Sequence, residues 1–424
     1  MSNHQANHQT NHPFSPLRHR AVRLIWSAAV LSDIGTWVQL IVVGSLIAAD
    51  TGSAVQTGLV ALATFMPQGL ASPVGGLLAD KFDRRVVFAS ALLLQACMTS
   101  GLAIALGLGV REPAVLTMFI LLASAAGALG QPSYAAMLPD LVPPNELMAM
   151  VSLGIYSWNS GRIVGPLVGT VLVATTGPAW TIGFNAITFV GLSCAVWMVR
   201  RPFLPHGSDG SIGERLVGGW RALRTTPGCW HGVVLLVLFN VTVVPFMGLI
   251  PIYAKAEFDG GTGTAGVISS AQGIGAILGG LLITMLAARR RRSDLLVHMV
   301  AVLSIGLAFY AVAPTVPLVA LAAAVLGAGG SSIFITSSTL LQRDAPPESR
   351  GRVMAMMQAC MGISYGIGIL LIGALGDIFD LPTAFLFGAI TMPLGFWAFT
   401  RRSKAWRLAV DGVPVVDRAQ VSVG

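Results

Sequence analysis

Two charged side chains lie deep inside long apolar stretches, where ionised groups are rare. Asp33 lies near the middle of the apolar stretch 22–48, and Arg162 lies near the middle of the stretch 149–174. Even on a lenient insertion scale, a charge at the centre of a membrane costs about 2.5–3.5 kcal/mol, so each charge needs a partner. We therefore predict that Asp33 and Arg162 form an ion pair inside a membrane.

Such a pair can carry proton chemistry. An apolar environment disfavours the ionised carboxylate, whereas a nearby arginine favours it. Moving the pair between wet and dry surroundings would load and unload a proton on Asp33, and protonation would release Arg162 or a bound substrate. The alternative is a static ion pair that only orients two helices. Both interpretations stay open at this point.

The elements that hold these residues are predicted to be membrane-spanning helices. The 424-residue chain is 54% hydrophobic and only 10% charged, whereas a typical soluble domain has about 25% charged residues. A spanning helix needs about 20 apolar residues, and a barrel strand only about 10 alternating ones. The sequence therefore predicts an all-α membrane protein with twelve transmembrane helices, at 22–48, 56–78, 86–108, 114–137, 149–174, 178–199, 229–254, 264–288, 295–313, 316–340, 353–376 and 381–400.

The basic residues predict how these helices are oriented. If the N-terminus is inside and the chain crosses twelve times, all of the 26 Lys and Arg residues except Arg111, Arg162 and Lys255 lie on one side. The positive-inside rule then puts both termini in the cytoplasm of a cell whose plasma membrane the protein spans. Nucleic-acid binding is the weaker interpretation of the net charge of +8.

The sequence also indicates an internal duplication, in which the second half repeats the first. Its longest polar interruption, 200–228, divides the twelve stretches into six and six, and the segment 140–146 has a similar counterpart at 344–348. We predict two pseudo-symmetric six-helix bundles joined by a cytoplasmic linker, an arrangement typical of secondary transporters. The predicted parts are a disordered tail at 1–20, bundles at 21–199 and 229–402, the linker at 200–228 and a second tail at 403–424.

Several segments resemble the major facilitator superfamily, most closely its drug and siderophore exporter branch, which includes enterobactin-type and macrolide-type exporters. They are Gly35-Thr-Trp37-Val-Gln39, the turn Gly76-Leu-Leu-Ala-Asp80-Lys-Phe-Asp-Arg84-Arg85, Gln131-Pro-Ser-Tyr134, Arg162-Ile-Val-Gly165-Pro166-Leu-Val-Gly169, and Ser349-Arg-Gly-Arg352-Val-Met354. The resemblance implies the major facilitator fold and transport by alternating access. It also implies that spans one and five, which hold Asp33 and Arg162, are neighbours.

The resemblance assigns two of these motifs a role. The turn motif would act as a cytoplasmic conformational latch made of Gly76, Asp80, Arg84, Arg85 and Arg352. In it, the Asp80 carboxylate would meet the positive amino terminus of span eleven. A tight turn that only fixes topology is the alternative. The antiporter-like motif of span five comprises Gly161, Gly165, Pro166 and Gly169, with Thr170 in place of its last glycine.

In this architecture spans one, four, seven and ten would line the substrate cavity. Their polar and aromatic candidates are Trp37, Gln39, Gln131, Tyr134, Asn240 and Thr336. An apolar wall with few hydrogen-bonding groups suits an amphipathic organic compound. Each of these side chains could instead make a helix–helix hydrogen bond.

We expect a proton antiporter that exports an amphipathic drug, siderophore or related metabolite, acting as a monomer on a small molecule and protons. Uptake by symport is the first alternative, and a sensor or assembly protein is the second. No nucleotide-binding loop and no metal-ligand cluster occur, so we expect no enzyme activity and no cofactor. The histidines His4, His8 and His12 lie in the tail predicted to be disordered, where metal binding is the less favoured interpretation.

Overall fold

The computed structural model describes residues 14–199, 212–287, 289–346, 349–402 and 406–411. These residues form α-helices, short 3₁₀ helices and turns, with no β-strand among them. Helices suit a membrane interior because every backbone hydrogen bond is made within the segment itself. The described residues form two buried hydrophobic clusters, made mostly of Leu, Ile, Val, Ala and aromatic side chains.

The first half of the chain forms five long helices. They are α1 (Arg20–Thr51), α2 (Ala54–Lys81), α3 (Arg84–Gly107), α4 (Pro113–Met137) and α5 (Leu147–Met198), with 3₁₀ turns η1 (Ser15–Arg18), η2 (Leu138–Leu141) and η3 (Pro144–Glu146). The 52-residue α5 is two spans joined at Gly177, whose φ of 79° and following proline interrupt the helix. A positive φ of this kind is readily adopted only by glycine.

The second half follows a short helix, α6 (Ile212–Thr225). Its long helices are α9 (Thr262–Ala287), α10 (Arg292–Val312), α11 (Val316–Asp344), α12 (Arg350–Ile378) and α13 (Leu381–Arg402), and the described chain closes with α14 (Trp406–Asp411). One further span is broken into α7 (Pro227–Thr242) and α8 (Pro245–Phe258). The break comes just before Pro245, which has no N–H to continue a helix ladder.

The predicted twelve spans are confirmed. Among the described residues, ten helical segments are long and apolar enough to cross a membrane, and α7 with α8 counts as one of them. The segment containing α5 crosses twice, and the 28-residue α2 supplies the remaining span. The protein is therefore a multi-pass membrane protein built entirely from helices in its described part.

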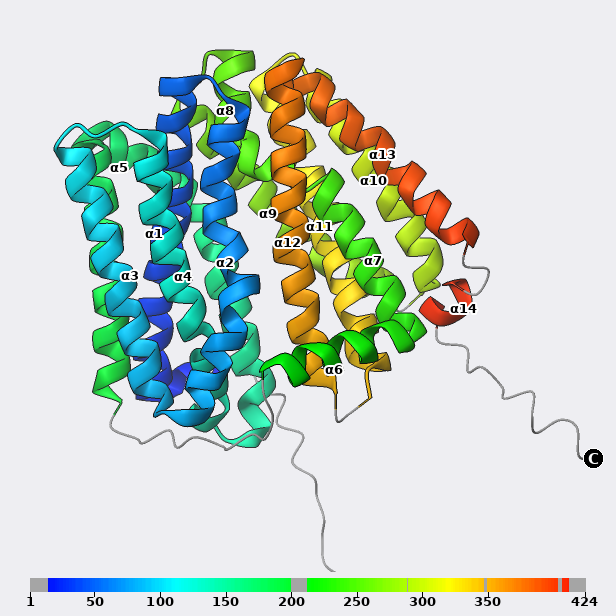
Figure 1. The fold of residues 1–424 in the computed structure, drawn as a ribbon, viewed down its shortest axis with the longest axis horizontal. Coiled ribbons are helices and arrows are strands. Elements are labelled where there is room, and N and C mark those ends of the chain that lie inside the picture. Colours follow the sequence, from blue (N-terminus) through cyan, green and yellow to red (C-terminus); the bar gives the residue numbers. More distant parts are fainter. Residues whose placement is uncertain (1–13, 200–211, 288, 347–348, 403–405, 412–424) are drawn as a thin grey trace, which may run out of the picture.

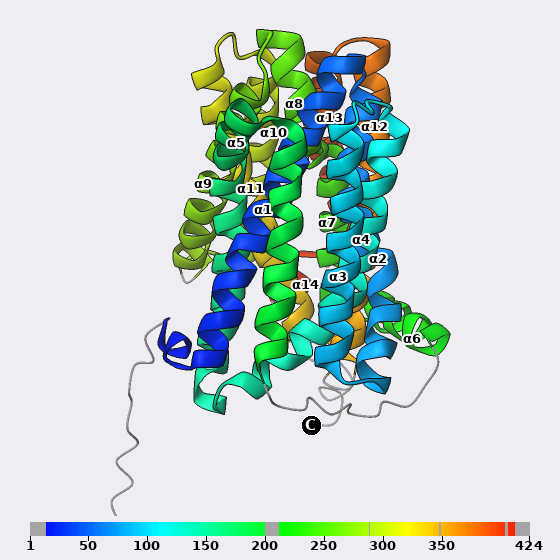
Figure 2. The ribbon, with the colours of Figure 1, turned by 90° about the vertical axis from the view of Figure 1, so that its left-hand side faces the viewer.

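The two halves stand side by side (Figure 1), with α2 and α12 next to each other at the boundary. Glycines allow this approach: a Cβ on Gly362 of α12 would lie 3.4 Å from the Cα of Gly69 on α2. Figure 2, turned by 90°, shows helices of the first half in front of the second, with α1 slanting across the more upright α5. Small residues are what membrane helices use to pack closely.

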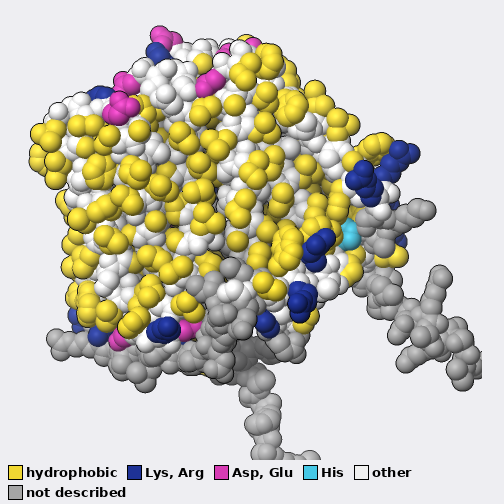
Figure 3. Space-filling view, viewed as in Figure 1, with side chains coloured by type: hydrophobic (Ala, Val, Ile, Leu, Met, Phe, Trp, Pro, Cys, Tyr) yellow, Lys and Arg dark blue, Asp and Glu magenta, His cyan; other side chains and the backbone are white. Residues whose placement is uncertain are grey.

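The two ends of the molecule differ in charge. We call the end with the start of α1, the α2–α3 turn and α6 the basic end, and the other the opposite end. On the face shown in Figure 3, hydrophobic side chains form a broad belt, Lys and Arg gather along the lower margin and the right-hand side, and most acidic side chains lie at the top. Such a belt is the surface that a bilayer's hydrocarbon covers.

Segments outside the spans also form helices. The predicted linker contains α6, and the predicted C-terminal tail contains α14, which docks through Asp411 onto Ser293 at the start of α10. The predicted N-terminal tail already forms η1 from Ser15, because Arg18 and His19 reach the buried Glu146. The tail histidines His4, His8 and His12 lie outside the described residues.

Candidate transport site

Asp33 lies on α1 against the first part of α5. Its carboxylate accepts a hydrogen bond from the Ser157 hydroxyl, and Tyr134 of α4 lies within its electrostatic reach. The α5 backbone comes close here because residue 161 is glycine: a Cβ at this position would lie 2.7 Å from the Asp33 carbonyl carbon. The acid thus sits inside the first half of the protein, bonded to a hydroxyl.

Arg162 faces the second half instead. Its Nε donates to Gln272 Oε1 of α9 at 2.8 Å, and its Nη2 lies 4.0 Å from the Met247 sulfur of α8. Its guanidinium carbon also lies 5.9 Å from the centre of the Trp37 ring. Four helices from the two halves, α1, α5, α8 and α9, therefore meet at this one side chain.

The predicted ion pair between Asp33 and Arg162 is not formed in this structure. Ser157 and Arg162 are five residues apart on α5, which turns their side chains about 140° from each other around the helix axis. The face that carries Ser157 meets α1, whereas Arg162 points to α9. The two charges are close in depth, as predicted, but they point to different neighbours.

The antiporter-like motif packs α5 against α1. A Cβ on Gly165 would lie 2.6 Å from Trp37 Cβ, and one on Gly169 would touch Val38 at 3.4 Å. With Gly161 these glycines form one stripe at four-residue spacing. Thr170 is bonded across the halves, since its hydroxyl lies 3.0 Å from the Pro166 carbonyl oxygen and 3.2 Å from that of Thr262 on α9.

Four aromatic side chains from four helices are linked by ring contacts that start at Trp37, the ring beside Arg162. We call them the central aromatic cluster: Trp37, Phe65, Trp158 and Tyr365. The Trp37 ring lies 5.6 Å from Trp158 and 6.1 Å from Phe65, and Phe65 lies 5.8 Å from Tyr365. Tyr365 comes from α12, so the cluster crosses the boundary between the halves. Trp37 Nε1 and Tyr365 Oη are buried without a hydrogen-bond partner in the described part of the chain.

The other predicted cavity residues lie apart from this cluster or are bonded within the bundles. Gln39 Oε1 accepts from Asn185 Nδ2 at 2.9 Å, and Tyr134 stacks on Phe88 with ring centres 4.9 Å apart. Asn240 donates to the carbonyl of Leu236 in its own helix at 2.8 Å. Gln131 is exposed and Thr336 is buried. Sequence reasoning missed Phe65, Trp158, Gln272 and Tyr365.

The predicted latch residues occupy the basic end, where they brace the first half. Arg84 donates to the Ala136 carbonyl at 3.2 Å and lies 3.6 Å from the Asp140 carboxylate, and Arg85 donates to the Val199 carbonyl at 3.2 Å. Asp80 lies in the last turn of α2, where its side chain also interacts with a neighbour. Arg352 lies against the linker helix, where a Cβ on Gly218 would be 2.9 Å from its Nη1.

The glycine that packs the latch segment is Gly75 rather than the predicted Gly76. A Cβ on Gly75 would lie 2.4 Å from the Leu129 carbonyl oxygen on α4, whereas one on Gly76 would meet nothing within 4 Å. Gly75 is therefore required for the contact between α2 and α4. The role of Gly76 in a latch stays a prediction.

An acid that the sequence analysis missed joins the halves at the opposite end. Asp377, near the end of α12, accepts hydrogen bonds from Ser53 Oγ at 2.7 Å and from the backbone N–H groups of Ala54 at 2.5 Å and Val55 at 3.1 Å. Those groups form the amino terminus of α2, which favours negative charge. The signal was present in the sequence, because Gly373-Ala-Leu-Gly-Asp377 has the same spacing as Gly76-Leu-Leu-Ala-Asp80.

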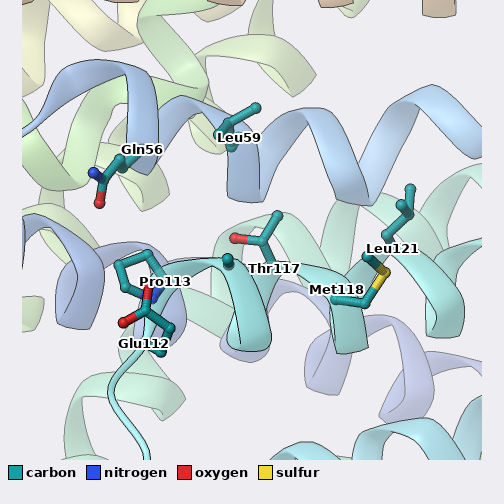
Figure 4. A pocket seen from close by; sticks show the side chains of 8 residues that line it. Gln56, Leu59, Glu112, Pro113, Thr117, Met118 and Leu121 are labelled. Atoms are coloured by element: carbon teal, nitrogen blue, oxygen red, sulfur yellow. The ribbon is translucent and has the colours of Figure 1, made fainter.

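A separate pocket of about 300 Å³ lies at the opposite end, between the starts of α2 and α4 (Figure 4). Its polar side is formed by Gln56, Glu112 and Thr117. Its apolar side is formed by Leu59, Met118 and Leu121. All of these residues belong to the first half. The pocket is thus distinct from the Arg162 region, where the halves meet.

Comparisons with known proteins agree with the membrane-spanning helical fold described above. A family model described as transmembrane secretion effector matches residues 11–410. The multidrug efflux pump Tap of Mycobacterium tuberculosis is 29% identical over 389 residues, covering 88% of this chain and 90% of Tap. The enterobactin exporter EntS of Shigella boydii is 27% identical over 363 residues, covering 84% and 86%. The nucleoside transporter NupG has a similar fold, with a TM-score of 0.68 at 16% identity over 90% of this chain and 98% of NupG.

Proposed function

Because this chain belongs to the transmembrane secretion effector family, within the major facilitator superfamily of membrane transporters, we propose that it exports an amphipathic small molecule by proton antiport. The relatives named as exporters of drugs and of enterobactin support the outward direction. The protein would work as a monomer, since each chain brings both halves of the transport path. It is a transporter rather than an enzyme.

The observation that carries proton coupling is the setting of Asp33. Its carboxylate lies within a membrane-spanning helix, with a hydroxyl rather than an arginine as its bonded partner. An ionised carboxylate in such a place is costly, and a protonated one is not. Asp33 would therefore take up a proton when it is closed off and lose it when its surroundings become wet.

The distribution of charge supports an orientation with the basic end in the cytoplasm of the plasma membrane, by the positive-inside rule. The opposite end then faces outward. In this structure the halves are joined at that end by the Asp377 bonds and by close contact of Gly373 with the start of α2. In the proposed orientation, these contacts would close the protein to the outside.

In the alternate state, the basic end would close and the opposite end would open. We assign Asp80 to that state, where its carboxylate would meet the amino terminus of α12. Asp80 and Asp377 end neighbouring helices at opposite ends of the molecule. Each carboxylate would stabilise one of the two states, so together they would set the ratio of the two states.

The test is transport in proteoliposomes and accumulation in an efflux-deficient bacterial host, across dyes, antibiotics and siderophores. The wild type should lower accumulation, and an uncoupler should abolish this effect. Asp33→Asn should lose proton-driven export at normal membrane expression. Asp50→Asn, which changes an exposed carboxylate on the same helix, is the control and should retain it.

Two outcomes would contradict the proposal. Full proton-driven export by Asp33→Asn would remove Asp33 from the coupling mechanism. Higher accumulation caused by the wild type, driven by the same gradient, would show uptake by symport instead of export.

A further inference from the structure

The Arg162 guanidinium is a cation in a membrane interior without an anionic partner. No carboxylate lies within ion-pair distance of it among the described residues, and its bonded partners are an amide oxygen and a thioether sulfur. Neither carries a charge. Arg162 is partly buried, and a cation inside a membrane span without a counter-charge is costly. An anion with good geometry that joins it lowers this cost.

Two neutral donors of the central aromatic cluster are also unused. The Trp37 indole N–H and the Tyr365 hydroxyl are buried, with each residue 4% exposed, and neither has a hydrogen-bond partner in the part of the chain that the structure describes. Leaving such a group unpaired costs about 1–3 kcal/mol, so buried donors are normally satisfied. Here they belong to the same aromatic cluster, on both sides of the boundary between the halves.

The faces of the rings provide the remaining chemistry. Trp37, Trp158, Phe65 and Tyr365 form tilted and edge-to-face pairs. Separation of the halves would part Tyr365 of α12 from Phe65 of α2 and free ring faces and edges for another aromatic group. Arg162 and Gln272, from α5 and α9, would part in the same movement.

We infer that Arg162 and the central aromatic cluster bind an aromatic compound that carries an anionic oxygen, such as a carboxylate or a phenolate. The anion pairs with Arg162, the ring packs against Trp37 and Phe65, and the Trp37 and Tyr365 donors bind oxygens of the compound. This inference rests on the proposed export function and narrows its substrate class. A site made only of aromatic rings would favour neutral or cationic compounds instead.

The test measures binding by isothermal titration calorimetry with the full chain in lipid nanodiscs. Three probes share one ring system: 2-naphthoate, 2-naphthalenemethanol and 2-naphthylmethylammonium. We expect naphthoate to bind about tenfold more tightly than the neutral alcohol, the ratio that one charge-assisted hydrogen bond supplies. The cation should bind most weakly.

Variants separate this site from general packing. Arg162→Gln should reduce the naphthoate preference to near one, and Arg162→Lys should keep part of it. Tyr365→Phe keeps the ring and removes only the hydroxyl, so it should bind naphthoate a few-fold more weakly and change binding of the alcohol less. Trp37→Phe removes the indole N–H and also shrinks the ring, so it should weaken binding of both probes, and of naphthoate more. Arg111→Gln, at an exposed position, is the charge-matched control and should behave as the wild type.

The inference is overturned if the wild type binds the alcohol or the cation as well as naphthoate, or if no probe binds. It is also overturned if Arg162→Gln keeps the preference in a monodisperse, stable preparation. Transport tests the proposed function separately. Proton-driven export of a cationic dye without any anion preference would leave that function standing and refute this substrate class.

Discussion

Replacing Asp377 should open the opposite end of the protein. The Asp377 carboxylate of α12 accepts three hydrogen bonds from the first turn of α2, so it joins the two halves at that end. These bonds cannot survive when the halves separate there. Asp377→Ala therefore removes an interaction that only the state closed at the opposite end contains.

The size of the effect follows from the geometry. A negative charge at a helix amino terminus contributes about 0.3–1 kcal/mol when exposed and up to about 2 kcal/mol when partly buried. The Ala54 bond is partly buried and the bonds from Ser53 and Val55 are exposed. We expect about 1–2 kcal/mol, which changes the ratio of the two states about 5- to 30-fold.

Double electron–electron resonance can measure this ratio. Spin labels would be attached at Asp50 of α1 and Glu257 of α8, which are exposed at the opposite end on different halves. The four native cysteines would first be replaced, at positions 97, 194, 229 and 360. The longer-distance population should rise in Asp377→Ala and rise less in Asp377→Glu.

Asp380→Asn is the matched control. Asp380 lies three residues further on, but its carboxylate accepts from the Thr383 N–H at 2.6 Å within the same half. It should leave the distance distribution unchanged. An unchanged distribution in Asp377→Ala, or an equal shift in Asp380→Asn, would refute the assignment of Asp377 as a residue that holds the halves together in one of the two states.

Three stability predictions concern packing and a buried acid, all measured by thermal unfolding in detergent. Gly165→Ala should lower stability by about 1–3 kcal/mol because its methyl group would collide with α1. Gly154→Ala on the same helix meets nothing within 4 Å and should leave stability unchanged. Equal effects of the two variants would refute the helix contact. Gly75→Ala should destabilise by a similar amount against α4, while its neighbour Gly76→Ala should be neutral or stabilising. Glu146→Gln should destabilise by about 1–2 kcal/mol because it weakens the charge-assisted bonds of Arg18 and His19 to this buried carboxylate, and unchanged unfolding would show that these bonds contribute nothing.

The sequence predicts the helices well because their causes are local. Apolar length determines each span, and Gly177 separates the predicted spans 149–174 and 178–199. The break before Pro245 lies inside the predicted span 229–254 and was not predicted, because proline alone is a weak signal: Pro132 and Pro166 stay inside continuous helices. The stripe of Gly161, Gly165 and Gly169 could also be recognised as a packing face from its spacing alone. These features require no knowledge of which helix lies next to which.

The site required that knowledge, and there the sequence predicts less. Depth along α1 and α5 suggested that Asp33 and Arg162 pair, but depth does not tell which way a side chain points around its helix. The direction of Arg162 depends on α9, far away in the chain. The central aromatic cluster draws on four helices, so no periodicity in one segment could reveal it.

The docking of α14 has a consequence for how the protein is made. The Asp411 carboxylate caps the first turn of α10 through the Ser293 N–H at 2.9 Å and its hydroxyl at 2.8 Å. The ribosome produces this cap 118 residues after the serine that uses it. During membrane insertion, α10 must therefore enter the bilayer with its amino terminus uncapped, and the second half is completed only when residues 406–411 fold back onto it.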